Sequence, residues 1–168
     1  MSEASVVSAQ DLIAIRALLE RNGLPTSDLE AARPEFAVIR ERGEVIAAGA
    51  LQPFGASALL RSVVVAADRR SMGLGQAIVS ELERLARAAQ ISRMILLTET
   101  AVDFFARQGY RVVERSTAPP NMQECEEFRS LCPSSATCMA KNLQPAPSAA
   151  DQGQATGSGS TRVPRKRP

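Results

Sequence analysis

The sequence contains no histidine and no tryptophan, and it has a single tyrosine. Without an imidazole, Ser-His-Asp and Cys-His nucleophilic sites and His-ligated zinc are all excluded. No apolar run approaches membrane-spanning length, and the first residues show no basic segment followed by an apolar one, so we expect neither a signal peptide nor a membrane partner. Any catalysis must therefore use carboxylates, hydroxyls, thiols, backbone amides or water.

Net charge is also low in most of the chain. From Gln144 onward there are four basic residues and one acid, which leaves 16 basic and 17 acidic residues before it. A body this close to neutral lacks the positive surface typical of nucleic-acid-binding domains, so we expect no nucleic-acid partner. The shift to Pro, Ala, Gly and Ser predicts one domain over 1–143 and a disordered tail with a basic end over 144–168.

Cysteines are few and unevenly placed. Cys125, Cys132 and Cys138 are odd in number, and no two have the C-x-x-C spacing of a zinc site. We therefore predict free thiols in a reducing cytoplasm and no metal site.

The apolar pattern predicts a mixed α/β fold. Helical spacing predicts helices after Ser8 and over 26–32, 74–89, 102–106 and the segment with Met122, Cys125 and Phe128. Short apolar runs predict strands over 36–40, 45–51, 59–65, 94–97, 110–113 and 136–143. Early antiparallel hairpins and a later β-α-β crossover together favour a mixed sheet flanked by helices.

One stretch has the features of an anion site. A buried strand ends at Val65, a basic turn follows, and a long helix begins directly after Gly73 and Gly75. The first turn of a helix has unpaired N–H groups and a partial positive charge, so a phosphate can accept several backbone hydrogen bonds there. A dinucleotide loop would need a third glycine where Ile78 stands, and the Gly-Lys-Ser/Thr of a mononucleotide loop is absent.

The Arg-x-x-Gly-x-Gly run at 70–75 instead resembles the acetyl-CoA signature of the GCN5-related N-acetyltransferase (GNAT) superfamily. The strand over 63–65 and the later run Phe104-Phe105-Ala106-Arg107-Gln108-Gly109-Tyr110 extend this resemblance, which covers roughly 8–143. It implies a GNAT-like fold and an enzyme that moves an acetyl group from acetyl-CoA, its co-substrate, to the primary amine of a small molecule. It further implies backbone contacts to acetyl-CoA from Val63, Val65, Arg70, Ser71, Met72, Gly73, Leu74 and Gly75.

Two positions depart from the family pattern. The tyrosine that reprotonates the departing thiolate falls at Phe105, and a frequent asparagine falls at Thr98. Thr98 and Glu99, at the end of a strand near the expected thioester, are the candidate catalytic residues. The other available carboxylates are Glu35, Asp103, Glu124 and Glu127. Arg61 would pair with a carboxylate of the acceptor or cap a sheet edge.

Two further segments, 60–65 and 128–139, resemble a bacterial GNAT subgroup encoded beside arsenic-resistance genes. This resemblance implies a role in arsenic or toxicant resistance but does not define the acceptor. Two alternatives stay open: a non-catalytic acyl-CoA-binding sensor, suggested by Phe105, and a thiol-based arsenical-binding domain that uses the three cysteines. A homodimer is also left open.

Overall fold

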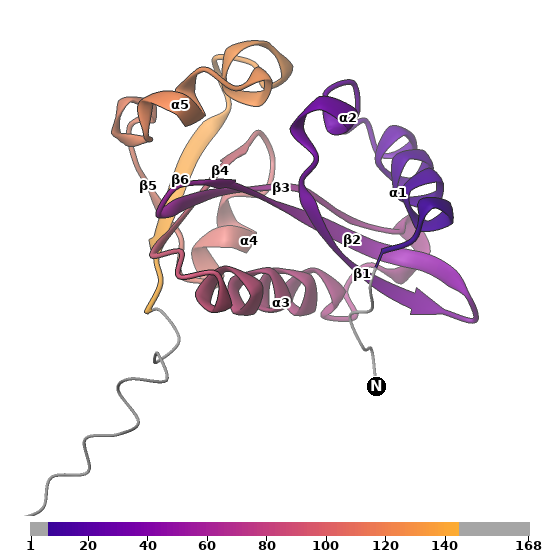
Figure 1. Ribbon diagram of the computed structural model, residues 1–168. Helices are drawn as coiled ribbons and strands as arrows, with labels where there is room; N and C mark the ends of the chain where they lie inside the picture. The colour runs from indigo at the N-terminus through magenta and orange to yellow at the C-terminus, as the bar shows by residue number, and fades with distance from the viewer. Residues whose placement is uncertain (1–6, 145–168) are drawn as a thin grey trace, which may run out of the picture.

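The computed structural model describes residues 7–144, which form a mixed sheet with helices on both faces (Figure 1). Except for Gln144, the predicted tail lies outside the described residues. The strands are β1 (Glu35–Glu41), β2 (Glu44–Phe54), β3 (Ser57–Val65), β4 (Arg93–Thr98), β5 (Arg111–Val112) and β6 (Thr137–Asn142). The α-helices are α1 (Ala9–Arg21), α2 (Leu29–Ala32), α3 (Leu74–Ala88), α4 (Val102–Arg107) and α5 (Pro120–Gln123). Shorter helical segments are η1 (Ala67–Arg69), η2 (Arg115–Thr117) and the π-helix η3 (Glu127–Leu131).

The strand order confirms the predicted mixed sheet. The order is β1-β2-β3-β4-β6-β5, and only β3 and β4 are parallel. Helix α3 connects these two strands, as a β-α-β crossover requires. The last strand, β6, lies between β4 and β5, so the end of the domain is built into the sheet.

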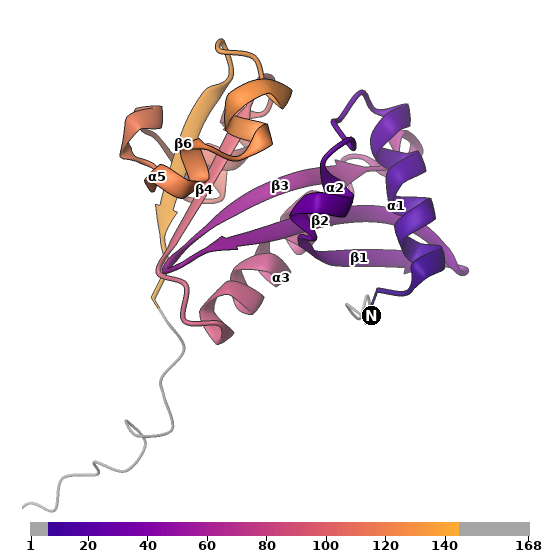
Figure 2. The ribbon, with the colours of Figure 1, turned by 45° about the horizontal axis from the view of Figure 1, so that its top comes forward.

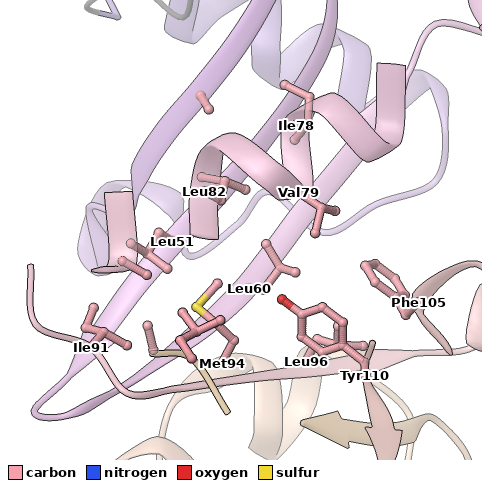
Figure 3. Close-up of a cluster of buried hydrophobic side chains, with 14 of the residues drawn as sticks. Leu51, Leu60, Ile78, Val79, Leu82, Ile91, Met94, Leu96, Phe105 and Tyr110 are labelled. Atoms are coloured by element: carbon pink, nitrogen blue, oxygen red, sulfur yellow. The ribbon is translucent and has the colours of Figure 1, made fainter. Parts of the chain in front are cut away.

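Helix α3 packs its apolar side on one face of the sheet. Ile78, Val79 and Leu82 are buried there against Leu51 and Leu60, and Figure 3 shows these side chains meeting. Full burial of each large aliphatic side chain contributes about 1.5–3 kcal/mol. This packing sets the position of the N-terminus of α3 relative to β3.

Helix α1 covers the opposite face and begins as predicted. Ser8 caps it: the hydroxyl accepts from the backbone N–H of Asp11, and the Asp11 carboxylate accepts from the Ser8 backbone. Arg40 on β1 pairs with Asp11, which ties the helix start to the sheet. Within residues 7–144, no helix is both long and apolar enough to cross a membrane.

Two predicted helices are wrong in their extent. Of 26–32, only Leu29–Ala32 is helical, because Ser27 and Asp28 form a turn from which the Asp28 carboxylate reaches Arg61. The predicted helix through Cys125 divides into α5 and η3. In η3 the Cys132 N–H bonds to the carbonyl of Glu127, five residues back, so this segment has the wider turn of a π-helix.

Candidate functional site

The sheet opens between β3 and β4 into a cleft. The two strands pair over three residues, and their last pair is Leu59 with Ile95. Beyond that pair they diverge, as Figure 2 shows, and residues of both strands line a cleft of about 600 Å³. This volume is typical of small-molecule sites. Because diverging strands leave backbone groups without sheet partners, the cleft walls can pair with an extended ligand.

A β-bulge in β3 decides which side chains face each side of the sheet. Between the paired residues Arg61 and Val64, β3 has two residues where β2 has one. Ser62 accommodates the extra residue with a φ of +57°. After the bulge, Val63 packs toward α3, while Val64 packs with α1. Without the bulge, Arg61 and Val64 would lie on opposite faces.

Helix α3 begins beside this cleft with uncapped amide groups. The chain turns into the helix at Gly73, whose φ of +76° lies in the left-handed region that glycine favours. No side chain caps this N-terminus. The N–H groups of the first turn have no intrahelical acceptors, and the helix dipole adds a partial positive charge, so an anion can bind here.

Two residues of the segment 70–75 line the cleft. At Gly75, a Cβ would lie 3.2 Å from Cζ of Phe104, so a side chain would crowd this wall. Arg70 lies across the end of β3, donating from Nε to the Val65 carbonyl at 3.4 Å and from its guanidinium to the side-chain oxygen of Asn22. It adds a positive charge beside the N-terminus of α3.

The structure brings six of the ten predicted site residues to the cleft. They are Val63, Val65, Arg70, Gly75, Thr98 and Glu99. The other four form the adjacent turn and do not line the cleft: Ser71, Met72, Gly73 and Leu74. Their predicted contact with acetyl-CoA is through backbone amides, and it stays a prediction.

The two candidate catalytic residues have different environments. Thr98 is nearly buried, and its Oγ1 accepts from the backbone N–H of Ala101 at 3.0 Å, which supports the start of α4. Its hydroxyl still has a proton to donate. Glu99 follows β4 and is exposed to solvent at the cleft.

Phe105 occupies the position of the family's catalytic tyrosine, and no other tyrosine lies at the cleft to take over its role. Phe105 is 7% exposed and packs edge-on against Phe104. It also packs edge-on against Tyr110 (Figure 3). The Tyr110 hydroxyl donates to Glu83 on α3 at 3.2 Å, and burial raises the pKa of Tyr110. Both rings therefore belong to the core beneath α3, and the only tyrosine of the chain does not line the cleft.

A buried ion network along the inner wall of the cleft was not predicted. Arg61, only 3% exposed, donates from both terminal nitrogens to the Asp28 carboxylate at 2.5 and 2.6 Å. Its Nε lies 2.9 Å from Oε2 of Glu127. Arg61 thus pairs with carboxylates of the protein itself, and because β3 lies inside the sheet it does not cap an edge. Its pairing with an acceptor carboxylate stays untested. The signal in the sequence was a charged residue inside an apolar strand, but its partners are remote in sequence.

The carboxylate of Glu127 accepts the fewest hydrogen bonds in this network. Its Oε1 accepts only the weak thiol hydrogen bond of Cys132, at 3.7 Å. Its Oε2 is close to Arg61 but accepts no hydrogen bond, since the Nε–H of Arg61 points to the Ser62 hydroxyl at 3.4 Å. Burial raises the pKa of Glu127, against the opposing attraction of Arg61.

The structure does not assemble the three-thiol site considered for an arsenical. Cys132 lines the cleft, while Cys125 and Cys138 pack in an apolar cluster with Phe128. Burial raises the pKa of all three thiols, that of Cys132 to about 12. Within 7–144, no three Cys, Asp, Glu or His side chains are grouped to hold a metal ion. The arrangement of the thiols in residues 7–144 therefore does not support the three-cysteine arsenical alternative.

Several known proteins share this architecture. An amino-acid acetyltransferase of Enterobacter sp. (strain 638) is 25% identical over 117 residues, which are 66% of this chain and 26% of that protein. The N-acetylglutamate synthase of Neisseria gonorrhoeae, solved with coenzyme A and N-acetyl-glutamate, aligns with a TM-score of 0.74 at 19% identity over 86% of this chain and 35% of that one. Rv2747 of Mycobacterium tuberculosis, solved in complex with CoA, aligns with a TM-score of 0.73 at 25% identity over 84% and 99%.

The extent of these matches differs. The chain spans about a quarter of the length of the Enterobacter protein and about a third of the Neisseria synthase. The model of the acetyltransferase (GNAT) family matches residues 10–110, which contain the diverging strands, the turn at 70–75 and the whole of α3. The chain therefore belongs to the GNAT family of acetyltransferases.

Proposed function

We propose that this protein transfers the acetyl group of acetyl-CoA directly to the primary amine of a small molecule. The observation that carries the proposal is the cleft between β3 and β4, which ends beside the uncapped N-terminus of α3. An extended thioester on one wall and an amine from the opposite side can meet only where two strands separate. The CoA complexes of the Neisseria and Mycobacterium relatives support acetyl-CoA as the co-substrate.

In this proposal the cofactor is held mainly by the backbone. Val63 and Val65 offer backbone groups to the pantetheine arm in the manner of an added strand. The amides from Arg70 to Gly75 surround the diphosphate, and the Arg70 guanidinium adds charge-assisted donors. Binding through backbone amides is consistent with the glycines of this loop, because a residue without a Cβ lets a ligand approach the main chain closely.

The proposed reaction has one bond exchange. A neutral amine nitrogen attacks the thioester carbonyl carbon, the C–N bond forms, and the C–S bond breaks with the electron pair leaving on sulfur. The amine loses a proton to a base or water, and the CoA thiolate gains one. Bringing both substrates into contact supplies a large part of the barrier reduction, and backbone amides can stabilise the developing oxyanion.

The protein offers no tyrosine to protonate the thiolate. Thr98 has a hydroxyl proton at the cleft, so we propose Thr98 or a water molecule as the donor, with Glu99 beside it as a proton acceptor. A thiolate is a moderate leaving group, so weak proton donation slows the reaction without abolishing it.

Thiol release from acetyl-CoA, measured with a panel of primary amines, tests the proposal. We expect amine-dependent release of CoA together with acetylated amine of the corresponding mass. Binding of acetyl-CoA without turnover on any amine would instead favour a non-catalytic acyl-CoA-binding sensor. That alternative was suggested by Phe105, which stands in place of the family's proton-donating tyrosine. Failure to bind acetyl-CoA would overturn both.

The role in arsenic or toxicant resistance remains a prediction from the resemblance of 60–65 and 128–139. The relatives named above give no support for it. The three free thiols are compatible with the reducing cytoplasm that the sequence favours.

A further inference from the structure

A cation at the inner wall of the cleft lies between two anions, of which Glu127 lines the cleft and Asp28 does not. Arg61 lies between Asp28 and Glu127, and the side chains of all three are at least nine-tenths buried. Because one positive charge faces two negative charges, the network has a net charge of −1 when both carboxyl groups are ionised.

The guanidinium of Arg61 has little left to offer a ligand. Two of its nitrogens hold the Asp28 carboxylate, and NH1 also donates to Oε1 of Gln52 at 3.1 Å. The Nε–H points to Ser62. A carboxylate of the acceptor would therefore have to displace a bidentate ion pair, the strongest kind of side-chain contact.

Glu127, by contrast, can still accept a donor from the cleft. Apart from the ion pair of Oε2 with Arg61, its carboxylate accepts only the weak hydrogen bond of the Cys132 thiol, and both Glu127 and Cys132 line the cleft. A thiol is a weak donor, whereas an ammonium has three N–H donors and a full positive charge. An ammonium that replaces the thiol contact would satisfy Glu127 and neutralise the network at the same time. Only the neutral amine can attack, so the bound ammonium passes one proton to water before the attack and loses a second proton as the amide forms.

The remaining charges divide the cleft into two ends. The other charged residues that line it are Arg70, beside the N-terminus of α3, and Glu99, after β4. Arg115 lies near Cys132 but donates to the carbonyls of Pro133 and Ala136. The end at α3 is thus positive and suits a diphosphate, while the end at Glu127 and Glu99 is negative.

We propose that the Glu127 end of the cleft binds the acceptor as an ammonium that carries no carboxylate beside it, with Glu127 as the residue that sets this preference. This inference rests on the proposed acetyl transfer and names its acceptor class: a simple or basic amine rather than an α-amino acid. The acceptor class would then differ from that named for the Enterobacter relative.

Matched acceptor pairs test the preference directly. Phenethylamine and phenylalanine differ only in the α-carboxylate, as do agmatine and arginine. In titration calorimetry with the CoA-bound protein, we expect each amine to bind about tenfold or more tightly than its amino acid, since a charge-assisted hydrogen bond is worth ~1.5–3 kcal/mol. Equal or tighter binding of the amino acids, or no detectable binding of either amine, would overturn the inference.

Two variants test whether the amine preference depends on Glu127. Glu127→Gln should raise the KM for the amines by about ten- to one-hundredfold while the affinity for acetyl-CoA stays unchanged. Glu124→Gln makes the same change at an exposed position of the same segment, off the cleft, and should leave both unchanged. An unaltered amine KM in Glu127→Gln would contradict the assignment.

Cys132→Ser covers the case in which Glu127→Gln does not fold. The serine hydroxyl is a stronger donor to Glu127 than the thiol, so the ammonium has a better donor to displace, and the amine KM should rise several-fold. An unchanged or lower KM would count against the inference. Failure of the acetyl transfer itself would appear differently, as absent acetyl-CoA binding or as thiol release with no amine.

Discussion

The role of Gly73 could be predicted from its neighbours in the sequence, whereas the role of Arg61 could not. Gly73 has a left-handed backbone, which glycine adopts without strain, and its place before a helix was visible in the sequence. Arg61 was visible only as a charge inside an apolar strand. Its meaning depends on Asp28 and Glu127, which approach it from two other elements. Local conformation can be inferred from neighbours in the chain, but ion pairing between remote residues cannot.

Gly73→Glu should abolish acetyl-CoA binding while the protein stays folded. No atom lies within 4 Å of a Cβ at this position, so the side chain has room, and its negative charge would oppose the diphosphate. Gly73→Gln is the matched control, because it has the same backbone strain and nearly the same size without the charge. We expect calorimetry to show a loss for Glu that exceeds the loss for Gln by about tenfold or more. Equal losses would mean that strain, and not charge, disturbs the site.

The contact of β2 with α3 shows how one element positions another. Gly49 lies where α3 crosses the sheet, and a Cβ there would come within 2.5 Å of Ile78 Cγ2 and 2.8 Å of Leu82 Cδ1. The missing side chain lets the helix approach the strand closely. Since the N-terminus of α3 borders the cleft, this approach also determines where its amides lie.

Gly49→Ala should therefore destabilise the protein by about 1–3 kcal/mol through overpacking. Urea unfolding followed by circular dichroism measures the change in the free energy of unfolding. In an Ile78→Ala background the same substitution should cost less, because the closest atom has been removed. If the cost is the same in both backgrounds, the crowding has another origin.

Across the whole molecule, the sheet is continuous where β3 and β4 are hydrogen-bonded and is split where these two strands separate. β3 and β4 pair near Leu59 and then diverge, and the two diverging parts are covered by different helices. The Asp28–Arg61–Glu127 network spans the opening, since its members come from the turn before α2, from β3 and from η3. A ligand that fills the cleft should consequently stabilise the entire domain.

Thermal unfolding with CoA and with pantetheine tests this expectation. At a concentration 100-fold above its dissociation constant, CoA should add about 2.7 kcal/mol to the free energy of unfolding. Pantetheine at the same concentration lacks the diphosphate and should raise the Tm far less. The Gly73→Glu variant should lose the response to CoA. A similar shift with pantetheine would show that α3 does not anchor the ligand.

Much of the fold and of the proposed cofactor side of the cleft could be predicted from local sequence pattern. The capping box at Ser8, the strand before Val65, the glycine turn and the amphipathic stripe of α3 each depend on residues close in sequence, so they could be predicted. The family resemblance rests on the same short-range features. The bulge at Ser62 left no such signal, because it is defined by its pairing with β2.

The proposed acceptor side of the cleft was decided only by the tertiary structure. The chain from the turn before α2, the bulged part of β3 and the π-helix η3 had to fold together before Asp28, Arg61 and Glu127 could meet. The same packing placed Cys132 beside Glu127 and kept it apart from the apolar cluster of the other two cysteines. Backbone geometry is encoded over a few residues, whereas the charge of a cleft depends on which distant side chains neutralise one another.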